Sequence, residues 1–117
     1  MSHSALLGIA AALLGVACSQ SQVPAGKLAN TRSAISAAEE SGADKTPRSA
    51  LHLKMAEDQL YKAERLMNEG DNEDAVLYLN QAQSDADLAL ALARTNQARE
   101  DARQAAARVE NLRKEAE

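Results

Sequence analysis

Apolar side chains recur at alternating intervals of four and three residues through most of the second half of this chain. The first such stripe consists of Ala75, Leu79, Ala82, Ala86, Ala89 and Ala93. Residues with this spacing lie on one face of an α-helix. We therefore predict a helix from about Glu73 to Lys114, roughly 60 Å long at about 1.5 Å per residue, that buries this stripe against other helices.

A second stripe follows after the register shifts by about one residue. It consists of Ala91, Thr95, Ala98, Ala102, Ala105, Val109, Leu112 and Ala116. The predicted helix is about twenty residues longer than the helix before it, so the end of this stripe has little within the chain to pack against. The spacing favours a partner, either a second copy or another protein, that contacts Val109 and Leu112. The alternative is a solvated helix held by local charge pairs such as Glu110 with Lys114.

The composition favours helices over strands. Hydrophobic residues make up 45% and charged residues 26% of the chain, but Trp and Phe are absent and about a fifth of all positions are Ala. Ala, Leu, Glu, Gln, Arg and Lys are strong helix formers, whereas the β-branched and aromatic residues that favour strands are few. The sequence predicts an all-α fold, a helical hairpin or three-helix bundle with a long, coiled-coil-like third helix.

Two shorter helices are predicted ahead of the long one. The first runs from about Lys27 to Ser41 and ends at Gly42, a favoured C-terminal residue. The second starts where Thr46 can cap the helix and Pro47 suits its first position. The apolar stripe of this second helix is Leu53, Ala56, Leu60, Ala63 and Met67.

Gly70 ends the second helix, and the short break after it predicts an antiparallel pairing of the second and third helices. We expect the intramolecular core to contain Leu53, Leu60, Met67 and Leu79. Alanine at most other facing positions lets the helices approach closely but buries little area at each contact.

The chain begins with an apolar run. From Ala5 to Ala17, thirteen residues carry no polar side chain. As a helix this run would span roughly 20 Å, less than the ~30 Å hydrocarbon core of a bilayer. It fits the apolar part of a secretory signal peptide, which we assign to residues 1–17. The alternative is a buried apolar helix of a cytosolic protein.

The segment 14–18 (LGVAC) resembles the lipobox of bacterial lipoproteins. The resemblance implies cleavage between Ala17 and Cys18, acylation of Cys18, and attachment to the membrane through its lipid chains. Ser19, directly after the cysteine, resembles the sorting pattern for the outer membrane. Residues 18–26 would then be the lipidated cysteine and a polar tether.

Residues with the chemistry for catalysis are few. His52 is the one histidine of the expected mature chain, and no second ligand lies near it at metal-binding spacing. We expect it to be a surface or half-buried helical residue. The net charge of −4 argues against nucleic-acid binding, because nucleic-acid binders usually carry a basic excess. We predict no enzyme activity, catalytic residue, metal site, cofactor or small-molecule substrate.

A pattern of small, apolar and turn residues runs through the middle of the chain. It includes Ala34-Ile35, Ala37-Ala38-Glu39, Gly42-Ala43, Pro47, Ala56-Glu57-Asp58-Gln59-Leu60, Ala63, Gly70, Ala75, Gln81-Ala82, Asp85-Ala86, Ala89 and Ala93. Over about residues 26–95 this pattern resembles domain-of-unknown-function family 4398. The resemblance implies a short helical domain of a bacterial envelope lipoprotein, and it carries over no catalytic residue. We place this domain at residues 27–95 and a helical C-terminal extension at residues 96–117.

Taken together, these features predict a lipoprotein of the cell envelope that faces the periplasm from the outer membrane. Its helical domain is expected to bind an envelope protein or a second copy of itself, with the lipid on Cys18 as the membrane contact. One alternative is a self-assembling coiled-coil spacer, which resembles the small major lipoproteins that link membrane and cell wall. Another is a soluble cytosolic helical adaptor, which would require that the N-terminus is not processed.

Overall fold

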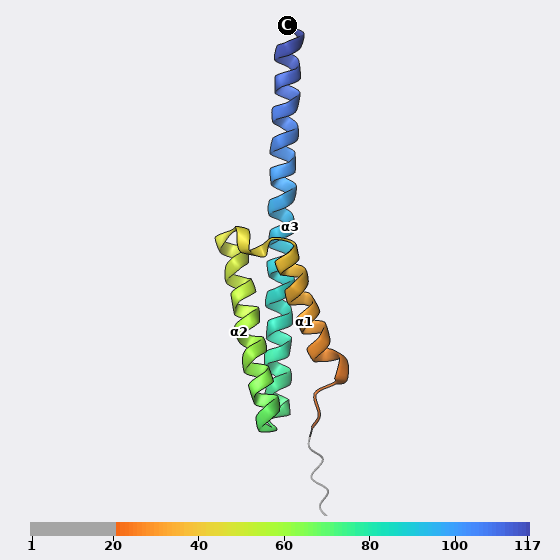
Figure 1. Cartoon of the computed structure of the whole chain (residues 1–117), viewed down its shortest axis with the longest axis vertical. Coiled ribbons are helices and arrows are strands. Elements are labelled where there is room, and N and C mark those ends of the chain that lie inside the picture. Colours follow the sequence, from red (N-terminus) through yellow and green to blue (C-terminus); the bar gives the residue numbers. More distant parts are fainter. Residues whose placement is uncertain (1–20) are drawn as a thin grey trace, which may run out of the picture.

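The computed structural model describes residues 21–117, in which the regular elements are all helices. They are α1 (Ala25–Glu40), the short 3₁₀ helix η1 (Ala43–Lys45), α2 (Pro47–Glu69) and α3 (Asn72–Ala116). Helices α1 and α2 lie along the first half of α3, and the second half of α3 projects alone beyond them (Figure 1). This arrangement confirms the all-α prediction of a three-helix bundle with a long third helix.

The ends of α1 and the start of α2 are set by local residue chemistry. The turn after α1 passes through Gly42, whose φ of 77° lies in the left-handed region that glycine adopts readily. The side chain of Thr46 accepts a hydrogen bond from the Ser49 backbone N–H, and Pro47 is the first residue of α2. Both roles agree with the sequence-based prediction.

The turn between α2 and α3 depends on Gly70. Its φ is 87°, and the N–H groups of Gly70 and Asp71 donate to the carbonyls of Met67 and Leu66 at 3.2 and 2.9 Å. This pair of bonds is the Schellman arrangement, which satisfies the last carbonyls of a helix and reverses the chain within two residues. The reversal makes α2 and α3 antiparallel neighbours, as predicted.

Replacing Gly70 by valine should lower the free energy of unfolding by about 1–2 kcal/mol, because a side chain in the left-handed region costs about that much. No atom lies within 4 Å of the position that a Cβ would take, so the cost is conformational and not a clash. Chemical denaturation measures it. Gly26→Ala is the control, since Gly26 lies in α1 without a positive φ and alanine there should leave the stability unchanged or raise it. Equal stability of Gly70→Val and the parent would contradict the prediction.

Alanine forms most of the contact between α2 and α3. The fully buried hydrophobic residues on the two helices are Ala56, Ala63, Ala75, Leu79, Ala82, Ala86 and Ala89, each 0% exposed. The whole first stripe of the sequence, from Ala75 to Ala93, is therefore on the core side of α3 as predicted. Side chains this small let the two helix backbones approach closely.

The predicted core is correct except near the α2–α3 turn. Leu53 and Leu79 are buried, and Leu60 packs against the core while half-exposed. Met67 is half-buried, and Leu66 takes the buried place next to the turn. Because a helical turn contains about 3.6 residues, the positions three and four residues after Ala63 flank the same face, and spacing alone does not choose between them.

Helix α1 closes one side of the α2–α3 pair. Ile35 and Ala38 of α1 lie in the core cluster with residues of α2 and α3. Buried Thr31 donates a hydrogen bond from its hydroxyl to the Lys27 carbonyl at 3.0 Å, and Arg32 forms an ion pair with Glu64 of α2 at 2.6 Å. The side of α3 that faces away from both α1 and α2 carries no other described element.

Candidate interaction surface

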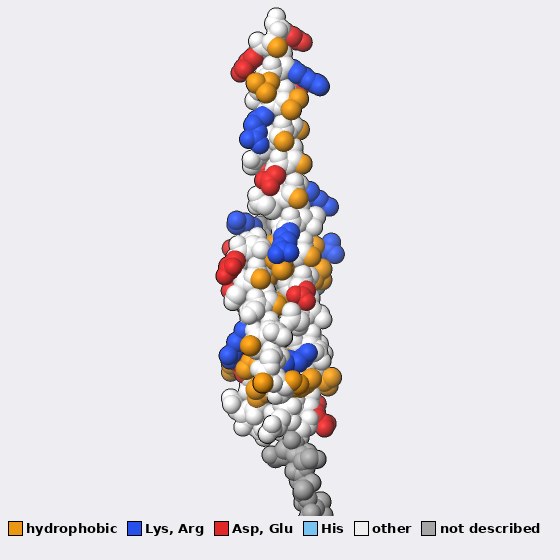
Figure 2. All heavy atoms as spheres, turned by 90° about the vertical axis from the view of Figure 1, so that its right-hand side faces the viewer, with side chains coloured by type: hydrophobic (Ala, Val, Ile, Leu, Met, Phe, Trp, Pro, Cys, Tyr) orange, Lys and Arg blue, Asp and Glu red, His pale blue; other side chains and the backbone are white. Residues whose placement is uncertain are grey.

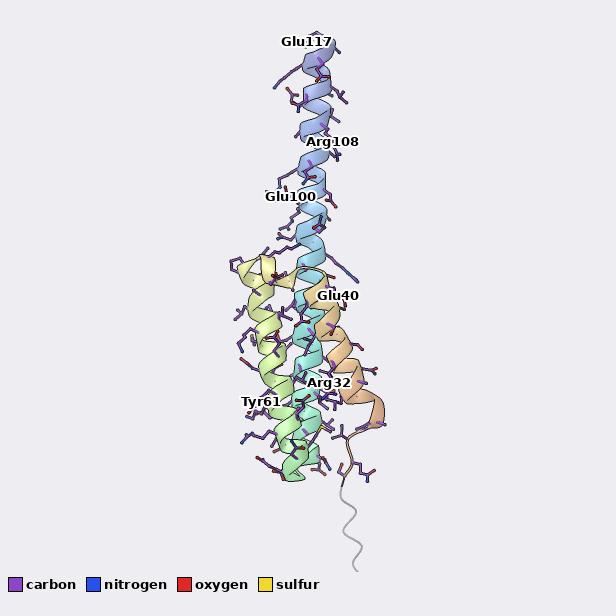
Figure 3. The ribbon with its side chains drawn as sticks, in the orientation of Figure 1. Arg32, Glu40, Tyr61, Glu100, Arg108 and Glu117 are labelled. Carbon is purple, nitrogen blue, oxygen red and sulfur yellow. The ribbon has the colours of Figure 1, made fainter. Side chains whose placement is uncertain are left out.

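The projecting half of α3 has no neighbour within the described chain. Every residue from Gln97 to Glu117 is exposed, and the labelled side chains of Glu100, Arg108 and Glu117 point away from an isolated helix (Figure 3). Ion pairs within this helix join Arg103 to Glu100 and Lys114 to Glu110. The second of these is the local pair predicted from the sequence. Exposed pairs of this kind stabilise a helix by only about 0.2–0.5 kcal/mol each.

Val109 and Leu112 lie on this projecting part. Their side chains are 51% and 65% exposed. They are three residues apart, so they share one side of the helix. Hydrophobic side chains run up this part of α3 among charged ones (Figure 2). That the two residues bind a partner stays a prediction.

The two apolar stripes of α3 lie further apart around the helix than expected. Ala89 and Ala93 are buried, whereas Ala91 and Thr95 are exposed. The expected shift of one residue is wrong: the second stripe is offset from Ala93 by two residues, which is about 200° around a helix. The second stripe therefore lies on the side of α3 that faces away from the bundle.

This outer stripe also begins earlier in α3 than predicted, before Ala91. The same alternation of three and four residues extends back from Ala91 to Leu88, Ser84, Gln81 and Leu77, all of them exposed. We name the complete set the outer seam of α3: Leu77, Gln81, Ser84, Leu88, Ala91, Thr95, Ala98, Ala102, Ala105, Val109, Leu112 and Ala116. It contains the four large hydrophobic residues of α3 that are exposed. Leu77 and Leu88 were missed because polar Gln81 and Ser84 lie between them.

The first half of the outer seam borders a shallow depression. Gln81, Ser84 and Leu88 line it from α3, together with Asn80 and Asp85, and Gln59 lines it from α2. The outer seam is therefore hollowed over the bundle and carries protruding Val109 and Leu112 on the projecting part.

A polar cluster connects α2 to α3 beside this depression. Nδ1 of His52 lies 2.8 Å from one carboxylate oxygen of Asp85, and the Gln59 side chain donates to the other oxygen at 3.0 Å. Lys62 contacts Tyr78 further along the same two helices. His52 is half-buried, which agrees with its prediction, but its carboxylate partner lies 33 residues later and only the helical hairpin brings the two together.

The side chains of His52, Gln59 and Asp85 connect α2 to α3 through hydrogen bonds. Across residues 21–117 no group of three or more His, Cys, Asp or Glu side chains is arranged to hold a metal ion. The side chains of His52 and Asp85 are 21% and 16% exposed, so each occupies a site where losing its partner costs free energy.

We expect Asp85→Ala to lower the free energy of unfolding by about 1–3 kcal/mol, because it leaves both His52 and Gln59 without an acceptor in a half-buried place. The matched control is Asp58→Ala. Asp58 pairs with Lys54 on the exposed surface of α2, where its hydrogen bond raises the pKa of Lys54, and such pairs contribute little. Thermal and urea unfolding would compare the two variants. Equal losses of unfolding free energy in the two variants would show that the contacts of Asp85 with His52 and Gln59 contribute no more to stability than an exposed ion pair.

The predicted anchor residues lie elsewhere. Ala17 and Cys18, with the rest of residues 1–20, are outside the described part of the chain. Among the helices that are described, no segment has the combined length and apolar character needed to cross a membrane.

Comparison with known proteins gives one result. The family model described as "Domain of unknown function (DUF4398)" matches residues 26–115. The match extends beyond residue 95, where the resemblance was expected to end, and includes most of the projecting part of α3. Neither the search of curated proteins nor the search of solved structures found a significant match. The match spans well over half of the chain, which therefore belongs to the DUF4398 family.

Proposed function

We propose that this chain is a non-catalytic interaction module of the bacterial cell envelope. A lipid on Cys18 would hold it at the periplasmic face of the outer membrane, and the outer seam of α3 would bind a protein partner. The observation that carries the proposal is the outer seam itself, a line of exposed apolar and small side chains along a helix that extends well beyond its own bundle.

The outer seam is better suited to binding than to solvation. A helix that stays in water needs no hydrophobic side chains at regular intervals of three and four residues. Here Leu77, Leu88, Val109 and Leu112 are 58%, 39%, 51% and 65% exposed. Burying a side chain of this size fully contributes about 1.5–3 kcal/mol. Covering all four side chains would therefore contribute substantially to the free energy of binding a partner.

The side chains of the outer seam also indicate the type of function. Most of them are Ala, Val and Leu, which contact a partner by close packing and not by proton transfer or nucleophilic attack. The polar members, Gln81, Ser84 and Thr95, are uncharged. Packing of this kind is typical of helix-to-helix association.

The anchor is supported by the sequence at the start of the chain. The apolar run from Ala5 to Ala17 is followed at once by Cys18, which is the only cysteine. Two or three acyl chains bind a membrane stably, since each buried CH₂ contributes about 0.8 kcal/mol. From Cys18 the chain reaches α1 at Ala25, a distance of at most about 24 Å when fully extended, so the bundle would stay close to the membrane.

Intact mass tests the anchor directly. The protein would be purified from its native host beside a Cys18→Ser version. We expect the loss of residues 1–17 and the addition of a lipid mass, both absent from the Cys18→Ser chain. A full-length, unmodified chain from the native host would contradict the anchor and the envelope location.

A further inference from the structure

We infer that the outer seam of α3 binds the outer seam of a second copy of this chain in antiparallel orientation, with Leu77 of one copy facing Ala116 of the other. The inference rests on the proposed function of the outer seam as a binding surface and names its partner. The paired region, residues 77–116, would be about 60 Å long. Each copy would present the same surface to the other, as in a two-fold symmetric dimer.

The shape of the outer seam supports this register. Antiparallel pairing with Leu77 facing Ala116 places Val109 of the second copy against Ser84 and Leu112 against Gln81. Ser84 and Gln81 line the shallow depression between α2 and α3. The protruding apolar residues of one copy therefore meet the hollowed part of the other.

The two remaining large residues also face small ones. Leu88 meets Ala105 of the second copy, and Leu77 meets Ala116. In a parallel, in-register dimer each residue of the outer seam would instead face the same residue of the second copy. Leucine would then face leucine and alanine would face alanine, so some layers of the interface would be overfilled and others underfilled. Helix interfaces pack at the density of protein interiors, which favours the arrangement that matches large with small residues at each layer.

The charges beside the outer seam select the same arrangement. Asp87, Arg94, Asp101 and Arg108 recur every seven residues along one edge of it, alternate in sign and are all exposed. Among the ion pairs within residues 21–117, none involves these four residues.

In the antiparallel dimer Asp87 faces Arg108 of the second copy and Arg94 faces Asp101, and symmetry repeats both pairs. Charged residues at this edge of a helix pair determine partner and orientation. A slip of one heptad would place Arg94 opposite Arg108 and Asp101 opposite itself. A parallel dimer would place Arg94 beside Arg99 and Arg108 beside Arg113, again with like charges in contact.

The opposite edge of the outer seam contributes less. In this register Asp85 of one copy lies opposite Ala106 of the other there, and Arg99 lies opposite Leu92, so neither charged residue faces another charge. The alternating charges of the first edge therefore determine the register.

The antiparallel arrangement has a consequence for the anchored protein. The start of α1 lies near Gln83 of α3, since Pro24, Gly26, Lys27 and Asn30 share a surface depression with Gln83. The two tethers of the dimer would therefore leave toward its opposite ends. A dimer anchored by lipids at both ends would lie along the membrane surface.

Disulfide trapping tests orientation and register together. The full chain carrying Cys18→Ser, which then has no thiol, would receive either Ser84→Cys or Val109→Cys. Under mild oxidation each variant alone should stay without covalent dimer, and an equal mixture of the two should form a disulfide-linked pair. A mixture of Ala98→Cys with Val109→Cys is the control, because those residues face each other only if the register slips by two heptads.

Other outcomes of this trapping would overturn the inference. Covalent dimer from Val109→Cys alone would indicate parallel pairing. Dimer in the control mixture but not in the Ser84→Cys mixture would indicate the slipped register. Absence of any covalent dimer, with a monomer mass in sedimentation equilibrium at high concentration, would mean that the partner is not a second copy.

Charge reversal gives a second, independent test. In sedimentation equilibrium Asp87→Arg alone and Arg108→Asp alone should each weaken dimerisation by about tenfold, because two ion pairs become two like-charge contacts. The double variant should return to the affinity of the parent. If the double variant did not regain the dimer affinity of the parent, the register would be wrong. Residues 87 and 108 of one copy are about 30 Å apart along the helix, so the two substitutions can restore an ion pair only between copies.

Substitution in the outer seam completes the test. Leu112→Asp should weaken self-association by at least about a hundredfold, because it places a charge in an apolar layer. Ala107→Asp, on another side of the same helical turn, should leave it unchanged. Unchanged association of Leu112→Asp would overturn the inference. A lipid-modified Cys18 together with a strictly monomeric chain would refute this inference and leave the proposed envelope function standing.

Discussion

Replacing Leu79 by alanine should lower the free energy of unfolding by about 2–5 kcal/mol, the largest loss we expect from any conservative change in this chain. Leu79 is 0% exposed and is the largest of the fully buried side chains. Its backbone carbonyl lies 3.4 Å from the hydroxyl of Thr31 in α1, so the residue sits where α1 meets α3. In a core made mainly of alanine, few neighbours have long side chains that could move into the cavity.

The measurement is urea unfolding followed by helical circular dichroism, with the parent and variant at one protein concentration. Leu51→Ala is the matched control, because Leu51 lies on α2 with 57% of its surface exposed and exposed substitutions usually change stability by less than about 0.5 kcal/mol. An equal loss of unfolding free energy in both variants would mean that α1 and α2 do not bury Leu79 as they do in the structure.

Enlarging Ala86 to leucine should cost about 3 kcal/mol, the upper end of the usual range for overpacking. Ala86 is 0% exposed and shares the core cluster with Ala56 of α2, which is also 0% exposed. With no side chain longer than a methyl group at either residue, the two helices must separate or tilt to admit a leucine.

The control for this change is Ala107→Leu in the same helix, where the alanine is exposed and beyond the bundle. Alanine and leucine have similar helix propensities, so this variant should unfold like the parent. If Ala86→Leu were as stable as Ala107→Leu, the close approach of α2 and α3 would be wrong.

The elements of the fold could be predicted from the sequence because short-range chemistry determines them. Thr46 with Pro47, and Gly42 with Gly70, act on residues within one turn of themselves, and their effects appear in the structure as expected. The buried stripe of α3 was also predictable, since helical periodicity determines which residues share a face. Leu66 is more buried than Met67 because of how α2 is rotated about its axis against α3, and the spacing of residues does not determine that rotation.

Contacts between distant residues were not predictable. His52 and Asp85 meet only because the hairpin brings α2 beside α3, and nothing near His52 in the sequence signals a partner. The role of the outer stripe was predicted at Val109 and Leu112, but its position was not. A heptad spacing gives the relation of residues within one stripe, and it took the structure to show that two such stripes lie on opposite sides of α3.

The structure thus explains why α3 carries two apolar stripes. The stripe from Ala75 to Ala93 holds α1 and α2, and its residues are nearly all fully buried. The outer seam from Leu77 to Ala116 is exposed along its whole length. One helix therefore serves both as the third member of a bundle and as a free surface, and the family match over residues 26–115 includes both parts.

The most direct test of the outer seam as a binding surface is site-specific photo-crosslinking in the native host. A photoreactive amino acid would replace Val109 in one strain and Ala107, on a different side of the same turn, in another. We predict a crosslinked product of twice the mass of the chain from position 109 and none from position 107. No product from position 109, or equal products from both positions, would show that the outer seam is not a binding surface.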